Sequence, residues 1–236
     1  MMKIRFIAAL IGALLLPFVG GCSDESRPES HTVVAVDLTE SFEDAARAGY
    51  VEQQVTSGLE RMTGSGTVAV LAFTSEVGSS RCVPPKATVT WAGNTEKFEK
   101  AKKVASSQLL ATLPDYFACA ADSVKKKSSD ILGAFAEAHS MLDGKAGQRT
   151  VALISDGCQN TYKIKTCKNE KMVDAKWRKA ALAALPAALR PDFAGVDLIM
   201  QGVAVNSEMQ QTGVDALKSL YREFAALTSA KSITIV

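Results

Sequence analysis

Two short clusters of carboxylate and hydroxyl side chains, far apart in the sequence, have the residue types that bind a hard divalent cation. The first is Asp37-Leu38-Thr39-Glu40-Ser41, and the second is Ser155-Asp156-Gly157. Alternate residues of an extended chain direct their side chains to the same side, so the first cluster can offer one carboxylate and two hydroxyls to a common point. Mg²⁺ prefers such oxygen ligands, at about 2.1 Å in octahedral geometry. Taken singly, Asp37 and Ser41 have a simpler interpretation as caps of a following helix.

Each cluster directly follows a short apolar segment that the sequence predicts to be a buried strand. Val33–Val36 precedes the first cluster, and Val151–Ile154 precedes the second. Continuous apolar runs of this length are typical of strands that are covered on both faces of a parallel sheet. Because ligands bind beyond the carboxyl ends of the strands in such sheets, we expect the two clusters to meet at one edge.

Strands and helices alternate along the rest of the chain. The strand before the second cluster extends over 150–155, and further strands are predicted at 67–73, 87–91, 196–205 and 233–236. Helices are predicted at 43–62, 95–112, 130–142, 172–185 and 212–228. A loop that carries Pro114 and Cys119 is expected after the second helix, and Pro186 is expected to end or kink the fourth. Strands separated by helices imply right-handed crossovers. We therefore predict an α/β fold in a single domain, with a doubly wound, mostly parallel central sheet flanked by helices.

With these elements the chain resembles a von Willebrand factor type A (vWA) domain, over roughly residues 31–236. In that family a D-x-S-x-S motif follows the first strand and forms part of a metal-ion-dependent adhesion site (MIDAS). Asp37, Thr39 and Ser41 match this motif, with threonine replacing the first serine but keeping its hydroxyl.

The other two parts of the family's metal site have counterparts further along the chain. Asp156 resembles the aspartate after the fourth strand and is followed by the glycine that is usual there. The segment Ser129–Phe135 resembles the start of a helix that the family begins with a threonine ligand. Ser129 stands at the threonine position, and the neighbouring Ser128 is the alternative ligand.

The resemblance implies a binding module with a divalent cation, Mg²⁺ or alternatively Mn²⁺ or Ca²⁺. Two aspartates and three hydroxyls leave the ion incompletely neutralised and one coordination position open for a carboxylate from a partner protein. In this arrangement Thr39, Ser41 and Ser129 coordinate the ion directly or nearly so. Asp37 and Asp156 orient the ligands, partly through water.

Two other functions fit parts of the sequence. A Mg²⁺-dependent phosphohydrolase of the haloacid-dehalogenase type begins with D-x-D after its first strand, but Thr39 occupies the position of the acid/base aspartate. Neither G-x-S-x-G nor G-x-x-x-x-G-K-[ST] occurs in the chain, and we do not expect an enzyme. The other alternative is a degenerate vWA-like module that keeps the fold and binds no metal, because Thr39 and Ser129 both depart from the family's motif.

The amino-terminal segment has the features of a bacterial lipoprotein signal peptide. A basic start precedes an apolar stretch, residues 6–18, which is short for a membrane span. The stretch ends in Val19-Gly20-Gly21-Cys22, which resembles a lipobox, so Cys22 is expected to be lipidated and to begin the mature chain. An ordinary secretory signal with a chance cysteine at its boundary is the alternative.

These features predict a signal peptide at residues 1–21, a lipid-anchored tether at 22–30 and the vWA-like domain at 31–236. The protein is expected in the bacterial cell envelope, facing the periplasm or the exterior. Because no aspartate directly follows Cys22, the outer membrane is favoured for a Gram-negative source. Without its signal peptide the chain keeps 25 of its 27 basic residues against 25 acidic ones. A net charge near zero gives no steering toward nucleic acid, and we expect no such partner.

Four cysteines remain in the mature chain: Cys82, Cys119, Cys158 and Cys167. An even number in an exported chain favours two disulfides, and the spacing alone leaves three connectivities. We expect Cys158–Cys167 as a local loop closure, which leaves Cys82–Cys119 as the second pair. A zinc site is the alternative, but no C-x-x-C pair occurs and the two histidines lack zinc-type spacing.

Overall fold

The computed structural model describes most of the chain, and everything below concerns that part. The described residues are 27–40, 44–75, 77, 82–122, 128–161, 164–167, 169–205 and 209–236. The expected signal peptide, the expected lipidation site Cys22 and the expected ligand Ser41 lie outside these ranges. No helix within them is both long enough and apolar enough to cross a membrane.

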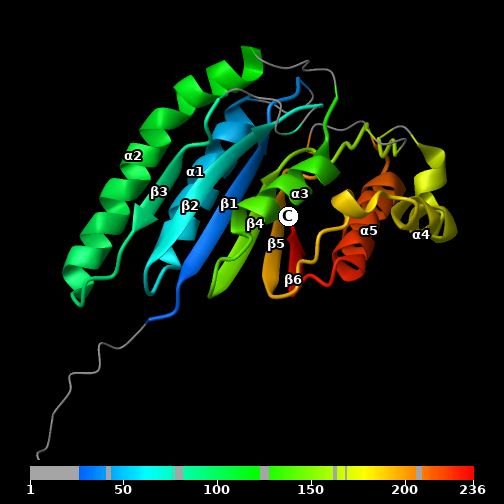
Figure 1. The fold of residues 1–236 in the computed structure, drawn as a ribbon. Coiled ribbons are helices and arrows are strands. Elements are labelled where there is room, and N and C mark those ends of the chain that lie inside the picture. The colour runs from blue at the N-terminus through cyan, green and yellow to red at the C-terminus, as the bar shows by residue number, and fades with distance from the viewer. Residues whose placement is uncertain are drawn as a thin grey trace, which may run out of the picture.

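A six-stranded sheet forms the centre of the molecule, with helices on both faces (Figure 1). Its strands are β1 (Ser30–Asp37), β2 (Gly66–Phe73), β3 (Lys86–Val89), β4 (Gln148–Ile154), β5 (Val196–Gln201) and β6 (Ser232–Ile235), in the order β3-β2-β1-β4-β5-β6. All neighbouring strands are parallel except β3, the edge strand, which runs antiparallel to β2. The chain starts at the centre of the sheet and extends it first to one side and then to the other. The prediction of a doubly wound, mostly parallel sheet is therefore confirmed.

The helices form one layer on each face of the sheet. They are α1 (Asp44–Glu60), α2 (Thr95–Asp122), α3 (Ile131–Leu142), α4 (Ala175–Ala183) and α5 (Gln211–Leu227), with short 3-10 helices η1 (Glu170–Val173) and η2 (Ala187–Leu189). Helices α1 and α2 cover one face, whereas α3 and α5 cover the other, with α4 beside α5 (Figure 1).

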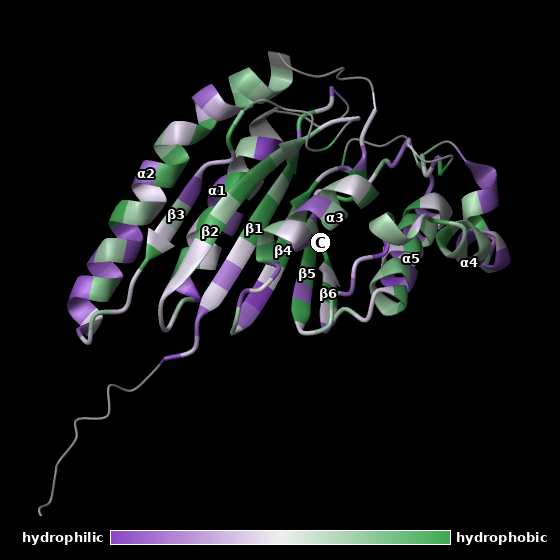
Figure 2. Cartoon of the chain, viewed as in Figure 1, coloured by the Kyte–Doolittle hydropathy of each residue, from purple (hydrophilic) through white to green (hydrophobic). Residues whose placement is uncertain are grey.

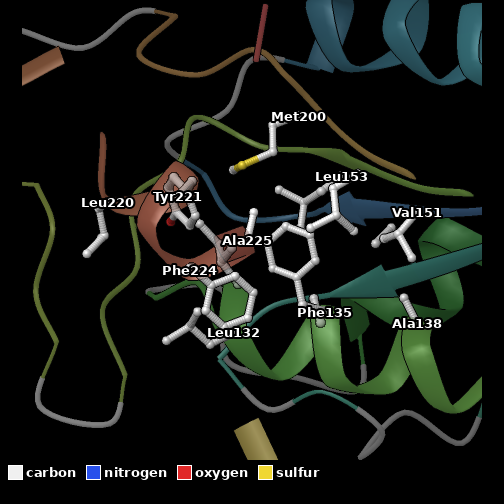
Figure 3. Close-up of a cluster of buried hydrophobic side chains, with 14 of the residues drawn as sticks. Leu132, Phe135, Ala138, Val151, Leu153, Met200, Leu220, Tyr221, Phe224 and Ala225 are labelled. Atoms are coloured by element: carbon white, nitrogen blue, oxygen red, sulfur yellow. The ribbon is translucent and has the colours of Figure 1, made fainter. Parts of the chain in front are cut away.

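Alternation along the central strand divides the apolar core into two layers. Val33 and Ala35 of β1 pack toward α3 and α5, whereas Val34 and Val36 pack toward α1 and α2. Strands β1 and β4 begin with hydrophilic residues and become hydrophobic toward their carboxyl ends (Figure 2). In the α3/α5 layer, the aromatic rings of α3 and α5 meet the aliphatic side chains of β4 (Figure 3). Since successive side chains alternate between the faces, Asp37 follows Val33 and Ala35 toward the α3/α5 layer.

The helix predicted for residues 95–112 continues through Pro114 and Cys119 as α2, so the loop expected there was wrong. Proline removes an N–H donor and disfavours a helix interior, but two long-range links hold this part of the chain. Tyr116 Oη accepts a hydrogen bond of 2.9 Å from the Ala72 amide of β2. Cys119 is bonded to the loop after β2 by a disulfide. Tertiary contacts therefore override the local effect of the proline.

Two other predicted elements differ from the observed ones, one in where it ends and one in being interrupted. The strand predicted for residues 196–205 stops at Gln201, because Gly202 has φ +84° and a left-handed residue turns the chain out of the sheet. The helix predicted for residues 172–185 is interrupted at Asp174, which is extended and accepts a hydrogen bond from the Lys176 amide at 2.8 Å. Asp174 is thus the N-cap of α4, and η1 is a separate turn before it.

The structure contains the two expected disulfides, Cys82–Cys119 and Cys158–Cys167. Cys82 follows β2 and Cys158 follows β4, so both bonds lie near the edge where the parallel strands end. Paired cysteines are typical of proteins outside the cytoplasm. They also leave none of these four sulfurs available for the zinc site considered as an alternative.

Replacement of Tyr116 by Phe tests the contact that holds the second half of α2. The variant keeps the ring but leaves the buried Ala72 amide of β2 without its acceptor. We expect the free energy of unfolding in urea to fall by about 1–3 kcal/mol, with an unchanged circular dichroism spectrum. An unchanged unfolding midpoint would show that the tyrosine hydroxyl does not support the helix.

Candidate metal site

Asp37 is the last residue of β1, and its carboxylate is completely buried. Oδ1 accepts hydrogen bonds from the backbone N and from Oγ1 of Thr39, at 2.9 and 2.7 Å. Oδ2 accepts a hydrogen bond of 2.7 Å from Ser155 Oγ. The register of the sheet explains the contact between Asp37 and Ser155. Val36 pairs with Ile154, and the next residue of each strand points to the same face.

Ser129 reaches the same cluster from the loop before α3. Its Oγ lies 3.0 Å from Thr39 Oγ1, and both side chains are buried. Ser128, the alternative ligand, is partly exposed. The backbone N of Asp130 donates to Thr74 O at 2.8 Å, which ties this loop to the end of β2. Of the two serines, the structure therefore brings Ser129 to the cluster.

Asp156 lies one residue beyond Ser155, at the end of β4, and is also buried. Its Oδ1 accepts a hydrogen bond from the Cys158 amide at 2.8 Å. Tyr221 Oη donates a hydrogen bond of 2.8 Å to Gly157 O, next to this aspartate. Burial raises the pKa of Tyr221 well above its usual value, and the negative charges of Asp156 and Asp37 raise it further. Both carboxylates therefore oppose ionisation of the Tyr221 hydroxyl.

The electrostatics of the cluster leave negative charge without full compensation. Burial raises the pKa of Asp37, and the hydrogen bonds from Thr39, Ser155 and Ser129 oppose that shift without cancelling it. A buried carboxylate whose partners are neutral hydroxyls favours binding a proton or a cation.

The donor set fits a hard divalent cation. A hydroxyl that donates its hydrogen to Asp37 keeps its oxygen lone pairs for a metal. Adjacent ligands of octahedral Mg²⁺ at about 2.1 Å lie ~3.0 Å apart, and the oxygens of Thr39 and Ser129 are 3.0 Å apart. The described residues contain no group of three or more His, Cys, Asp or Glu side chains that could hold a metal ion. A site here therefore depends on hydroxyl ligands, as the sequence motif predicts.

Sequence reasoning gave no role in the site to three residues that shape the cluster. Ser155 was placed in the second polar cluster, and its contact with Asp37 could have been predicted, because Ser155 continues the alternation of β4 toward the face of Asp37. Tyr221 and Gln159 carry no such signal. Tyr221 reaches the site from α5, and Gln159 contacts the loop of Ser129 only in the folded chain.

No protein-family model matches the chain, and no curated protein matches it. Several solved structures are similar in fold. An aerotolerance-related membrane protein from Bacteroides fragilis is 12% identical, with 88% of this chain and 91% of that chain covered and a TM-score of 0.41. The manganese-loaded TRAP protein of Plasmodium vivax is 13% identical, with 89% and 68% covered and a TM-score of 0.38. A von Willebrand factor type A structure from Catenulispora acidiphila is 15% identical, with 86% and 42% covered and a TM-score of 0.37.

These similarities are too distant to support an argument about function. The chain also spans less than half of the Catenulispora acidiphila chain. The doubly wound, mostly parallel sheet that the resemblance to vWA domains implied is nevertheless the fold of this chain.

Replacement of Asp37 by Asn tests the cost of the buried charge in metal-free protein. The pKa of Asp37 is higher in the folded protein than its usual value of 3.8. As the pH rises from 3.8 through the folded-state pKa, the buried carboxyl ionises and the free energy of unfolding falls. We expect Asp37→Asn to raise the free energy of unfolding at pH 7 in the presence of a chelator, and the gain to shrink as the pH approaches 3.8. Urea unfolding at several pH values measures it. The exposed Asp115→Asn is the control, and a loss of stability at pH 7 would contradict the assignment.

Proposed function

We propose that this chain is a vWA-like binding module of the bacterial cell envelope that engages a protein partner through a divalent cation. The observation that carries the proposal is the convergence of the Asp37 carboxylate with the hydroxyls of Thr39 and Ser129 at the carboxyl ends of the strands. In this proposal the signal peptide is removed and lipid at Cys22 anchors the protein to a membrane, the outer membrane in a Gram-negative cell.

The ion, Mg²⁺ or alternatively Mn²⁺ or Ca²⁺, would be held by Thr39, Ser129 and Ser41 through hydroxyl oxygens, with Asp37 and Asp156 supplying negative charge directly or through water. Only two carboxylates face a doubly charged ion in this set. The ion would therefore keep a position that attracts a carboxylate from the partner, which is the chemistry it supplies. Hydroxyl ligands suit this role, because further protein carboxylates would weaken that attraction.

The position of the tether supports a binding face that points away from the membrane. The Arg27 guanidinium lies 3.7 Å from the centre of the Trp91 ring, and its Nη1 donates to Thr63 O at 3.3 Å. This contact lies beside the start of β1, whereas Asp37 ends that strand. Eight residues of strand span about 26 Å. The tether would therefore enter at the end of the domain opposite the candidate site.

Thr39 also distinguishes binding from phosphoryl chemistry. Its hydroxyl donates to Asp37, at the position where a haloacid-dehalogenase-type enzyme needs a second carboxylate. A binding function is better supported than catalysis by this arrangement.

The degenerate module remains a second candidate because of one observation. Both oxygens of Asp37 already accept hydrogen bonds from hydroxyl groups of the chain. If those bonds alone stabilise the buried carboxylate, the cluster serves only to join β1 to β4. The module would then bind its partner without metal.

Calorimetric titration of the chelator-stripped domain with Mg²⁺ and Mn²⁺ separates these candidates. We expect binding heat in the parent protein and none in Asp37→Ala at millimolar metal, because the variant loses the carboxylate that orients the hydroxyls. Metal at a hundred times its Kd should also raise the free energy of unfolding by about 2.7 kcal/mol. Asp115→Ala is the matched control and should bind like the parent. Absence of heat in the parent would favour the degenerate module.

Partner binding is tested by capture from envelope extract on immobilised domain, with Mg²⁺ or with a chelator. We expect a protein that is retained with Mg²⁺, is released by the chelator, and is lost with Asp37→Ala and with Asp156→Ala but not with Asp115→Ala. A partner that is retained equally in all of these conditions would bind without the metal site.

A further inference from the structure

We infer that the loop closed by Cys158–Cys167 positions Ser129 as a metal ligand, and that Gln159 is the residue through which it acts. The inference rests on the proposed metal site. It assigns a positioning role to a residue that neither motif contains and that lies in the sequence 30 residues after the serine it orients.

The backbone of the closed loop pairs directly with the backbone of Ser129. Gln159 forms an isolated parallel bridge with Ser129, and the Asn160 amide donates to Ser129 O at 3.1 Å. Gln159 and Ser129 are both 1% exposed. The serine is therefore held between β1, through its contact with Thr39, and the loop that follows β4.

The side chain of Gln159 completes the start of α3, which begins two residues after Ser129. The first amides of a helix have no acceptor within the helix. Asp130, the N-cap, provides for one of them, because its Oδ1 accepts from Gly133 N at 3.0 Å. Its backbone O accepts the first regular bond of the helix, from Ala134 N at 2.9 Å. The Leu132 amide instead donates to Gln159 Oε1 at 3.0 Å. Gln159 thus fixes both the backbone of Ser129 and the helix that follows it.

Thr161 forms a second link between the loop and the start of α3. Its Oγ1 donates to Asp130 Oδ1 at 2.9 Å and also contacts Gln159 Nε2. Any displacement of Ser129 away from Thr39 would have to break this network or carry the whole loop with it.

The loop is itself held as a closed unit. Gly157 turns the chain after β4 with φ +84°, a conformation that suits glycine. Thr166, which is fully buried, accepts a hydrogen bond from the Gln159 amide at 2.8 Å, and its own amide donates to Gln159 O at 3.0 Å. The disulfide joins Cys158 to Cys167, the neighbours of these two residues. The covalent bond therefore keeps Gln159 in the place from which it reaches Ser129.

The test compares metal binding and amide exchange in three variants and the parent protein. Gln159→Met removes both polar contacts at similar volume, and Cys158→Ser with Cys167→Ser opens the loop. Tyr116→Phe is the control, because it loses a buried hydrogen bond in the α1/α2 layer, on the opposite face of the sheet from α3, and should cost stability without affecting the site. Mn²⁺ affinity is measured by calorimetry and by the electron paramagnetic resonance signal, and exchange is followed at the amides of Leu132 and Asn160.

We expect Gln159→Met and the double serine variant to bind Mn²⁺ about 10–100-fold more weakly than the parent, the usual effect of losing a residue that orients a ligand. Tyr116→Phe should bind like the parent. Unchanged affinity in Gln159→Met, or an equal loss in Tyr116→Phe, would overturn the inference.

Amide exchange distinguishes failure of this inference from failure of the metal site. If the parent binds no Mn²⁺, the proposed function fails, but faster exchange at Leu132 in Gln159→Met and at Asn160 in the double serine variant would still support the positioning network. Gln159→Glu keeps the acceptor and should preserve slow exchange at Leu132. Parent-like exchange at both amides in the first two variants would overturn the inference whatever the metal does.

Discussion

Burial of the Asp37 carboxylate at the end of the central strand is the constraint that the surrounding loops satisfy. Removing a charge from water costs several kcal/mol unless other groups compensate for it. Here the compensation comes from neutral hydroxyls, two of them more than ninety residues further along the chain, and burial still raises the pKa of the carboxyl. Thr39 and Ser155 must therefore donate toward one point, and Ser129 must lie against Thr39.

The strand order makes this convergence possible. Because β1 lies between β2 and β4, the loops that leave all three strands meet around its last residue. The loop of Ser129 is held from the β2 side through Thr74 and from the β4 side through Gln159. The site is therefore built around the sheet's central three strands. The neighbouring strand β5 and the turn after it support it directly, because the Ser155 amide donates to Gln201 O at 3.1 Å and the Ala204 amide donates to Asp156 O at 2.9 Å.

Much of this arrangement could be predicted from the sequence, because short-range patterns determine it. The continuous apolar runs of β1 and β4 predict two buried parallel strands, and the polar residues that end them lie together for that reason. The continuation of α2 past Pro114 could not be predicted, since the contact of Tyr116 with β2 outweighs a local helix-breaking signal. The role of Gln159 could not be predicted either. It depends on pairing with Ser129, thirty residues earlier, and no local sequence pattern indicates that pairing.

The length of α2 has a consequence for how anything can approach the edge of the sheet. Tyr116 contacts Ala72, the penultimate residue of β2, and six more residues of helix follow it to Asp122. At 1.5 Å per residue, the helix rises about 9 Å further, and Figure 1 shows its last turns beyond the strand ends. In the part of the chain that the structure describes, this overhang raises the α1/α2 side of that edge above the strand ends. If the proposed partner binds there, the end of α2 would stand beside it, so the partner would have to approach obliquely or reach the hydroxyls with a narrow extension.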